Sequence, residues 1–197
     1  MSETGSVKFT CERIPTKLTA IPEFAELNRY RRKLIRLGLI GVDSNGIGFG
    51  NMSIRDRSAN NFYITGSGTG ERRELDPSDY ARVVAYDFER NWLRCEGSTV
   101  ASSESLTHAA IYESEPAAGA IIHGHDLRLW AALFGQVPTT AKLVAYGTPE
   151  MANEVEGLFK RTDLKQRKVL VMGGHEGGIV AFGRNVAEAF GVISALT

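Results

Sequence analysis

The sequence predicts a single α/β domain whose central sheet is mixed or mainly antiparallel and is flanked by helices. Three observations support this fold class. Strand-like segments cluster in the first half, strands and helices alternate in the second half, and no repeat or linker divides the chain. The 197 residues suffice for one domain with a sizeable core, whereas two full domains would be tight. We expect an extended N-terminal arm over residues 1–21 and the domain over residues 22–197.

The expected elements follow from periodicity and turn residues. Apolar residues recur at nearly helical spacing between Pro22 and Ile40, and Gly41 would stop that helix. Ser102 and Ser103 would open another helix, since serine is a favoured N-cap residue. The remaining segments are strands at 51–55, 62–65, 82–87, 92–95, 118–123, 169–172 and 179–182, and helices at 102–112, 127–134, 148–160 and 185–196.

Charge and composition argue against a nucleic-acid partner. Lys plus Arg and Asp plus Glu both number 23, so the basic surplus of a nucleic-acid binder is missing. The one basic cluster lies in the first expected helix, where a solvated helix face is favoured over a polyanion site. That cluster consists of Arg29, Arg31, Arg32 and Lys33.

Cysteine usage and hydropathy indicate the compartment. Cys11 and Cys95 are far apart and lack CxxC spacing, so free thiols in a reducing compartment are favoured over a disulfide framework. The N-terminus lacks the apolar core of a signal peptide, and no apolar run approaches the roughly 20 residues of a membrane span. We therefore expect a cytoplasmic protein with no membrane partner.

Three of the four histidines form a pattern that indicates metal chemistry. His123 and His125 end an apolar strand, where residues i and i+2 point to the same side. His175 lies between paired glycines after another strand, so its backbone can approach a second element closely. A lone His-x-His is more often chance or a core pair, but the third histidine favours a catalytic metal with one open position.

Small and acidic residues supply candidate substrate contacts. Ser102 and Ser103 at a helix start could bind an anion, because free backbone N–H groups and the helix dipole favour negative charge there. The loops at residues 50–51 and 65–68 could cradle a phosphate, or could be plain turns. Glu104 is a candidate acid, although taken alone it is better explained as a helix-favouring residue.

Taken in their order along the chain, the motifs resemble those of the class II aldolase and adducin head-domain family. The resemblance runs from about Phe24 to the C-terminus. The family's Gly-Asn-x-Ser-x-Arg strand matches residues 50–55, and its threonine and glycine loop matches residues 65–68. Its Ser-Ser-Glu motif matches residues 102–104, followed at the family spacing by His108 and Tyr112. Its His-x-His motif matches residues 123–125, and its final His-Gly element is changed to Gly174-His175-Glu176-Gly177.

The resemblance implies a role for each matching residue. His123, His125 and His175 would bind zinc or a similar divalent ion, and Glu104 would be the acid/base and in some states a fourth ligand. His108 would be a packing residue that does not bind the metal. A substrate phosphate would be held by Gly50, Asn51, Ser67, Gly68, Ser102 and Ser103.

The function implied is a metal-dependent lyase that cleaves or forms a C–C bond in a small phosphorylated ketose through a metal-stabilised enediolate. The resemblance also implies a homotetramer. A sugar-phosphate dehydratase or epimerase with the same metal site is the alternative. Family epimerases typically carry Ser-Ser-Asp, whereas dehydratases share the glutamate. A non-catalytic adducin-like interaction module is less favoured, because adducin heads lack the metal histidines.

Two departures from sugar-phosphate aldolases leave the aldehyde partner open. The segment between His125 and His175 is shorter and omits a glycine-rich stretch that carries a tyrosine, although Tyr146 lies nearby. The sequence also ends at Thr197, where the family's C-terminal tail with another tyrosine is expected to be absent.

Overall fold

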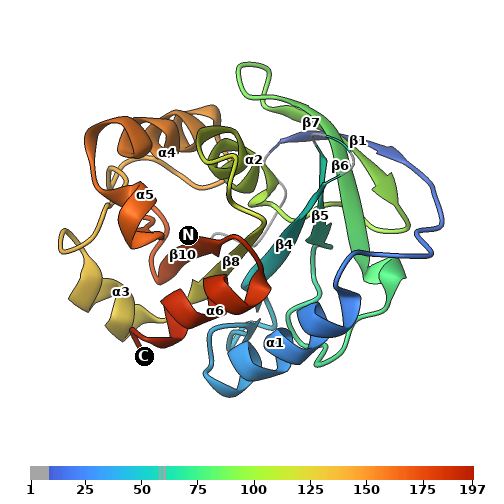
Figure 1. The fold of residues 1–197 in the computed structure, drawn as a ribbon, viewed down its shortest axis with the longest axis horizontal. Helices are drawn as coiled ribbons and strands as arrows, with labels where there is room; N and C mark the ends of the chain where they lie inside the picture. The colour runs from blue at the N-terminus through green and yellow to red at the C-terminus, as the bar shows by residue number, and fades with distance from the viewer. Residues whose placement is uncertain (1–8, 58, 60) are drawn as a thin grey trace.

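The computed structural model describes residues 9–57, 59 and 61–197 (Figure 1). The first part of the expected N-terminal arm, residues 1–8, lies outside the described residues. A two-stranded ribbon is formed by β2 (Gly41–Val42) and β3 (Gly48–Phe49). The main sheet contains β1 (Thr10–Ile14), β4 (Asn51–Asp56), β5 (Asn61–Thr65), β6 (Tyr80–Asp87), β7 (Trp92–Gly97), β8 (Ala120–His125), β9 (Val169–Val171) and β10 (Gly178–Gly183).

The main sheet is mixed and mainly antiparallel, as predicted. Its strand order is β1-β7-β6-β5-β4-β8-β10-β9. Each neighbouring pair of these strands is antiparallel except β1 and β7, which pair in parallel at the edge. The antiparallel neighbours β4 and β8 place Asn51 directly opposite His123 at the centre of the sheet.

Helices cover both faces of the sheet, which confirms the α/β fold class (Figure 1). Buried residues of α2 and α4 share one apolar core with one sheet face, and those of α1 and α6 share a second core with the opposite face. Within the described residues, the helices are too short or too polar to cross a lipid bilayer. The helices are α1 (Phe24–Arg36), α2 (Ser105–Ser114), α3 (Leu127–Leu133), α4 (Pro149–Arg161), α5 (Leu164–Arg167) and α6 (Val186–Ser194).

Two helix boundaries differ from the prediction by three residues or more. Helix α1 ends at Arg36, because Gly38 adopts φ +73° and the amides of Gly38 and Leu39 donate to the carbonyls of Ile35 and Leu34. This is a Schellman ending, so the earlier glycine stops the helix and Gly41 instead enters β2. Helix α2 begins at Ser105 with Glu104 as its cap residue, since the Ser102 carbonyl accepts the Ser105 amide in a preceding turn.

The expectation of a solvated basic face on α1 is wrong for Arg31. Its side chain is fully buried, and its guanidinium donates to the carbonyls of Thr69 and Arg72. Burial lowers the pKa of Arg31 from its ordinary value. Arg31 therefore connects α1 to the loop that follows β5, while Arg29 and Arg32 pair with acids at the surface.

Two residues of β4 hold α2 on the sheet. The Ser53 hydroxyl lies 2.7 Å from Nδ1 of His108 and 2.8 Å from the hydroxyl of Tyr112. The Arg55 guanidinium donates to the Tyr112 carbonyl and lies 4.6 Å from the centre of the Tyr112 ring. Burial lowers the pKa of His108 to about 3, so this imidazole is neutral near pH 7. These contacts fix α2, and Glu104 lies one turn before His108.

Candidate metal centre

One cavity of about 650 Å³ brings together Glu104 and every residue predicted to bind metal or phosphate. Its walls come from the start of β4, the end of β8, and the loops that follow β5, β7 and β9. Its volume is in the range of small-molecule sites. His108 does not line this cavity and contacts Ser53 instead.

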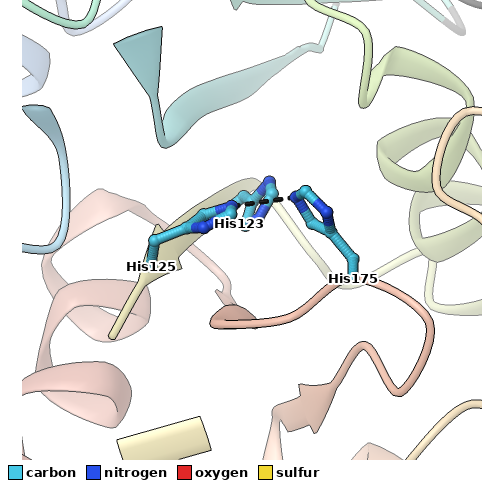
Figure 2. Close-up of side chains that lie close together, drawn as sticks. All are labelled: His123, His125 and His175. Atoms are coloured by element: carbon cyan, nitrogen blue, oxygen red, sulfur yellow. Dashed lines mark hydrogen bonds between the residues drawn. The ribbon is translucent and has the colours of Figure 1, made fainter. Parts of the chain in front are cut away.

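His123 and His125 reach the cavity from β8. The side chains of a strand alternate between its two faces, so these two residues point to the same side, and their rings lie 4.8 Å apart. The intervening Gly124 faces the opposite side, where a side chain would meet Leu39 and Ile193. Figure 2 shows the two imidazoles beside each other on the strand and facing the third. The structure therefore places both imidazoles on one side of β8, as the His-x-His spacing predicts.

His175 approaches from the turn between β9 and β10 (Figure 2). Its Nε2 atom lies 2.9 Å from Nε2 of His125, and its ring packs 4.2 Å from the ring of Tyr146. The preceding Gly174 is required by close packing, because a Cβ there would lie 1.9 Å from the Val144 carbonyl oxygen. A small residue next to the histidine therefore allows the turn to approach residues 140–146.

The donor set fits a divalent metal ion. The three histidines offer ring nitrogens that lie within 4.8 Å of one another. Burial lowers the pKa of His123 well below its ordinary value and that of His125 to about 4, so both imidazoles are neutral near pH 7. Neutral imidazole is the metal-binding form of histidine. Nε2 of His123 is also buried without a hydrogen-bond partner among the described residues, which a metal ion would explain.

Glu104 lies beside the histidines. Its Oε1 atom is 3.7 Å from Nε2 of His175 and 4.0 Å from Nδ1 of His123. The side chain is buried, and its other oxygen accepts a hydrogen bond from the Thr107 hydroxyl at 3.3 Å. This carboxylate can therefore act on a substrate atom held at the histidine cluster, or bind the metal itself.

The small residues occupy the other side of the cavity. A bridge between Gly66 and Ala101 brings the loop that carries Ser67 and Gly68 next to Ser102 and Ser103. Gly50 has φ +78°, and a Cβ there would lie 2.7 Å from the Leu39 carbonyl oxygen, so only glycine suits the entry to β4. Asn51 is the next residue, and its side-chain nitrogen Nδ2 lies 3.4 Å from Nδ1 of His123. Asn51 thus joins the two sides of the cavity.

Several lining residues were not assigned a role from the sequence. Tyr146 is buried against His175, although no motif distinguishes it in the sequence. Phe49 packs its ring 5.6 Å from that of His125, and Asp43 and Glu176 bring carboxylates to the cavity. Glu176 could have been assigned to the site from the sequence, because it directly follows His175. Asp43 and Phe49 could not, because the β2–β3 ribbon brings them to the cavity.

Comparison with known protein families gives a match over most of the chain. The family described as "Class II Aldolase and Adducin N-terminal domain" matches residues 29–197. A search of curated proteins gives no significant match. Enzymes of the class II aldolase type depend on a divalent metal, and the three histidines form a cluster that could bind one.

Solved structures share the fold at low sequence identity. An L-fuculose 1-phosphate aldolase has 24% identity and a TM-score of 0.67, over 89% of this chain and 82% of its own. The L-fuculose-1-phosphate aldolase of Thermus thermophilus has 25% identity and a TM-score of 0.61, over 88% of each chain. YgbL of Klebsiella pneumoniae, described as an aldolase, epimerase or decarboxylase, has 21% identity and a TM-score of 0.66, over 87% and 83%. Together with the family match, the common fold shows that this chain belongs to the class II aldolase and adducin N-terminal domain family.

Proposed function

We propose that this protein is a metal-dependent lyase that cleaves or forms a C–C bond in a small phosphorylated ketose. The observation that carries the proposal is the position of the Glu104 carboxylate, 3.7–4.0 Å from two histidines of a three-imidazole cluster. The Glu104 side chain and three imidazole nitrogen donors face the same cavity, and the small-residue loops line its opposite side. Family membership supports an aldolase-type lyase in general terms.

We propose that His123, His125 and His175 hold the ion, and that the ion is zinc. Three imidazoles with an open position are a donor set of catalytic zinc sites. When bound, the cation would stabilise negative charge on the substrate oxygens as a Lewis acid. The Tyr146 ring against His175 and the Asn51 amide near His123 would orient two of the imidazoles.

The phosphate of the substrate would lie among Gly50, Asn51, Ser67, Gly68, Ser102 and Ser103. Gly68 faces open space, since a Cβ there would meet no atom within 4 Å, and Ser67 is exposed to the cavity. Among the described residues, no lysine or arginine lines the cavity. The phosphate would therefore be held by hydroxyl groups and backbone N–H groups, as in other sites made of main-chain donors.

Glu104 would move the proton. After the C–C bond is cleaved, the Glu104 carboxyl group would return a proton to the carbon atom that has kept the electron pair. In the direction of synthesis the same carboxylate would remove that proton, as a general base. Its burial and its contact with Thr107 hold the carboxylate in place within the cavity.

The test is the exchange of the enolisable proton of dihydroxyacetone phosphate with solvent deuterium. This half-reaction needs no aldehyde, so it does not depend on knowing the second product. Glu104→Gln keeps the size of the side chain but cannot exchange a proton near neutral pH. We expect the variant to retain its metal and to lose about 10²–10⁴ in exchange rate.

Glu176→Gln is the matched control, because Glu176 is the other glutamate that lines the cavity, and it is exposed. This control should exchange at nearly the parental rate. Equal exchange in the parent and in Glu104→Gln would leave Glu104 a purely structural role at the start of α2. A metal-loaded parent that shows no exchange would favour the alternative reaction or a different substrate.

The alternative is a sugar-phosphate dehydratase or epimerase that uses the same metal and phosphate sites. The similarity to YgbL supports keeping this candidate, since that protein is described as an aldolase, epimerase or decarboxylase. Glutamate at position 104 favours the lyase or dehydratase over an epimerase. A product screen with phosphorylated ketoses and methylthio-sugars, using metal-loaded protein, would separate these reactions.

We further propose a homotetramer. Two large apolar side chains support an assembly: Leu127, just after β8, is 62% exposed, and Leu143 is 98% exposed. Leu127 lies close to the histidine cluster, because a Cβ at Gly177 would contact both Leu127 and His125. Light scattering should give the mass of four chains, and a monomer at working concentration would contradict the proposal.

A further inference from the structure

The fold brings two cysteines together that are distant in the sequence. Cys11 lies on β1 and Cys95 on β7, the parallel pair at one edge of the sheet. Cys11 is paired with Leu93 and Cys95 with Arg13, so the two cysteines are offset by two residues along neighbouring strands. Their sulfur atoms are 3.5 Å apart and are not bonded. A disulfide needs the sulfurs about 2.0 Å apart, so the edge strand β1 would have to shift relative to β7 for the bond to form.

The two sulfurs differ in exposure and in electrostatic surroundings. Cys95 is buried in the apolar core, whereas Cys11 is partly exposed and open to a small reagent. The hydrogen bond from the Cys11 thiol, the backbone of Ala101 and the positive charge of Arg13 lower the pKa of Cys95, while burial opposes this shift. The same hydrogen bond raises the pKa of Cys11, so Cys95 is the thiol that more readily becomes a thiolate. A lowered pKa increases the fraction of thiolate, which is the reactive form.

We propose that Cys11 and Cys95 are a redox modification site, at which a peroxide converts the two thiols into an intramolecular disulfide. In the first step one thiolate attacks the peroxide, its sulfur becomes a sulfenic acid, and water leaves. In the second step the other thiol attacks that sulfur, the S–S bond forms, and a second water leaves. Two thiols are thereby oxidised to one disulfide while one peroxide is reduced to two waters.

The disulfide would affect the part of the chain that carries more than half of the residues lining the cavity. It would close a loop from residue 11 to residue 95, which contains Asn51 and Ser67. The pair also adjoins the backbone of Ala101, which bridges to Gly66 and directly precedes Ser102. Oxidation would thus fasten β1 to β7 and limit the motion of the phosphate-side loops. The proposal is independent of the reaction catalysed in the cavity.

The experiment treats the reduced, full-length protein with hydrogen peroxide at neutral pH. We expect the free thiols of the denatured protein to fall from two to none, and peptide mapping without reductant to show Cys11 joined to Cys95. The melting temperature should rise by about 5–15 °C, because a long loop is closed, and dithiothreitol should reverse the rise. Gel filtration should show no new oligomer.

Cys11→Ser is the control, since it changes the partly exposed member of the pair and leaves the core residue in place. This variant should form no intramolecular cross-link and should show no stabilisation after peroxide treatment. The proposal fails if the parent keeps two free thiols, forms disulfides only between chains, or oxidises to sulfinic acid without a cross-link. It also fails if Cys11→Ser is stabilised by peroxide as much as the parent.

Discussion

The two sides of the cavity are built in different ways. The histidine side is fixed by regular strands, because His123 and His125 follow the alternation of β8 and face Val180 and Gly178 of β10 in register. Apart from Asn51 at the start of β4, the small-residue side is made of loops. It is held by long-range contacts such as the hydrogen bonds from buried Arg31 to Thr69 and Arg72.

The side chains on the two sides of the cavity are therefore positioned by different kinds of contact. A hydrogen-bonded ladder fixes the direction of each side chain along a strand, so the metal donors need few supporting contacts. A loop has no such ladder and must be positioned by individual groups brought from elsewhere in the fold. Changes on the strand side should therefore affect metal binding, whereas changes to the supports of the loops should affect phosphate binding.

The largest expected effect is on metal affinity. His123→Ala removes a buried donor, and we expect zinc affinity to fall by more than about 100-fold, since even outer residues of metal sites contribute 10–100-fold. Competition with a chromophoric chelator would measure this. The matched control is His108→Asn, which removes the remaining histidine outside the cluster and should leave the affinity close to that of the parent. Equal zinc binding by parent and His123→Ala would refute the metal assignment.

The next largest effect is expected when Arg31, which holds the loop after β5, is replaced. Arg31→Met fills similar space but leaves the carbonyls of Thr69 and Arg72 without their donor, and the contact with Thr69 is buried. We expect the free energy of unfolding to fall by about 2–3 kcal/mol, as for lost hydrogen bonds to charged groups. Phosphate affinity should fall with it, and zinc affinity should not change. Urea unfolding and isothermal titration would measure these quantities. A parallel loss of zinc affinity would mean that the two sides are not independent.

A smaller effect is expected for phosphate binding at the loops themselves. Ser103→Asp places a carboxylate beside the proposed phosphate position, and we expect inorganic phosphate to bind about 10-fold more weakly because like charges repel. Ser103→Asn is the matched control, since asparagine has the same size without the charge. If the Asp and Asn variants bind phosphate equally well, the phosphate lies elsewhere in the cavity.

The smallest expected effect is on the pH dependence of stability, through the buried His108 of α2. The pKa of His108 is lowered by burial from 6.5 to about 3, so the unfolded chain takes up this proton first as the pH falls. The stability that the buried, neutral His108 imidazole allows is fully present above pH 6.5 and is lost as the pH falls toward 3. Between pH 7 and 5.5 the parent should lose about 1 kcal/mol more stability than His108→Asn, by urea unfolding. Identical losses would show that His108 is not buried in its neutral form.

The sequence by itself determined the local features of this protein. Alternation identified β4 and an apolar run identified β8, and the two-residue period of a strand placed His123 and His125 on one side of β8. The order of the motifs indicated the family, which the match over residues 29–197 confirms. These features were predictable because a strand's own backbone geometry sets which way its side chains point.

Only the tertiary structure decided which distant residues meet. Arg31 looked like one of several surface arginines, and its burial follows from where the loop after β5 crosses α1. The contact of Cys11 with Cys95 depends on β1 joining β7 in parallel, and that of Tyr146 with His175 depends on the close packing at Gly174. Strand order and loop packing arise from the whole core rather than from local periodicity, so no short sequence pattern encodes these contacts.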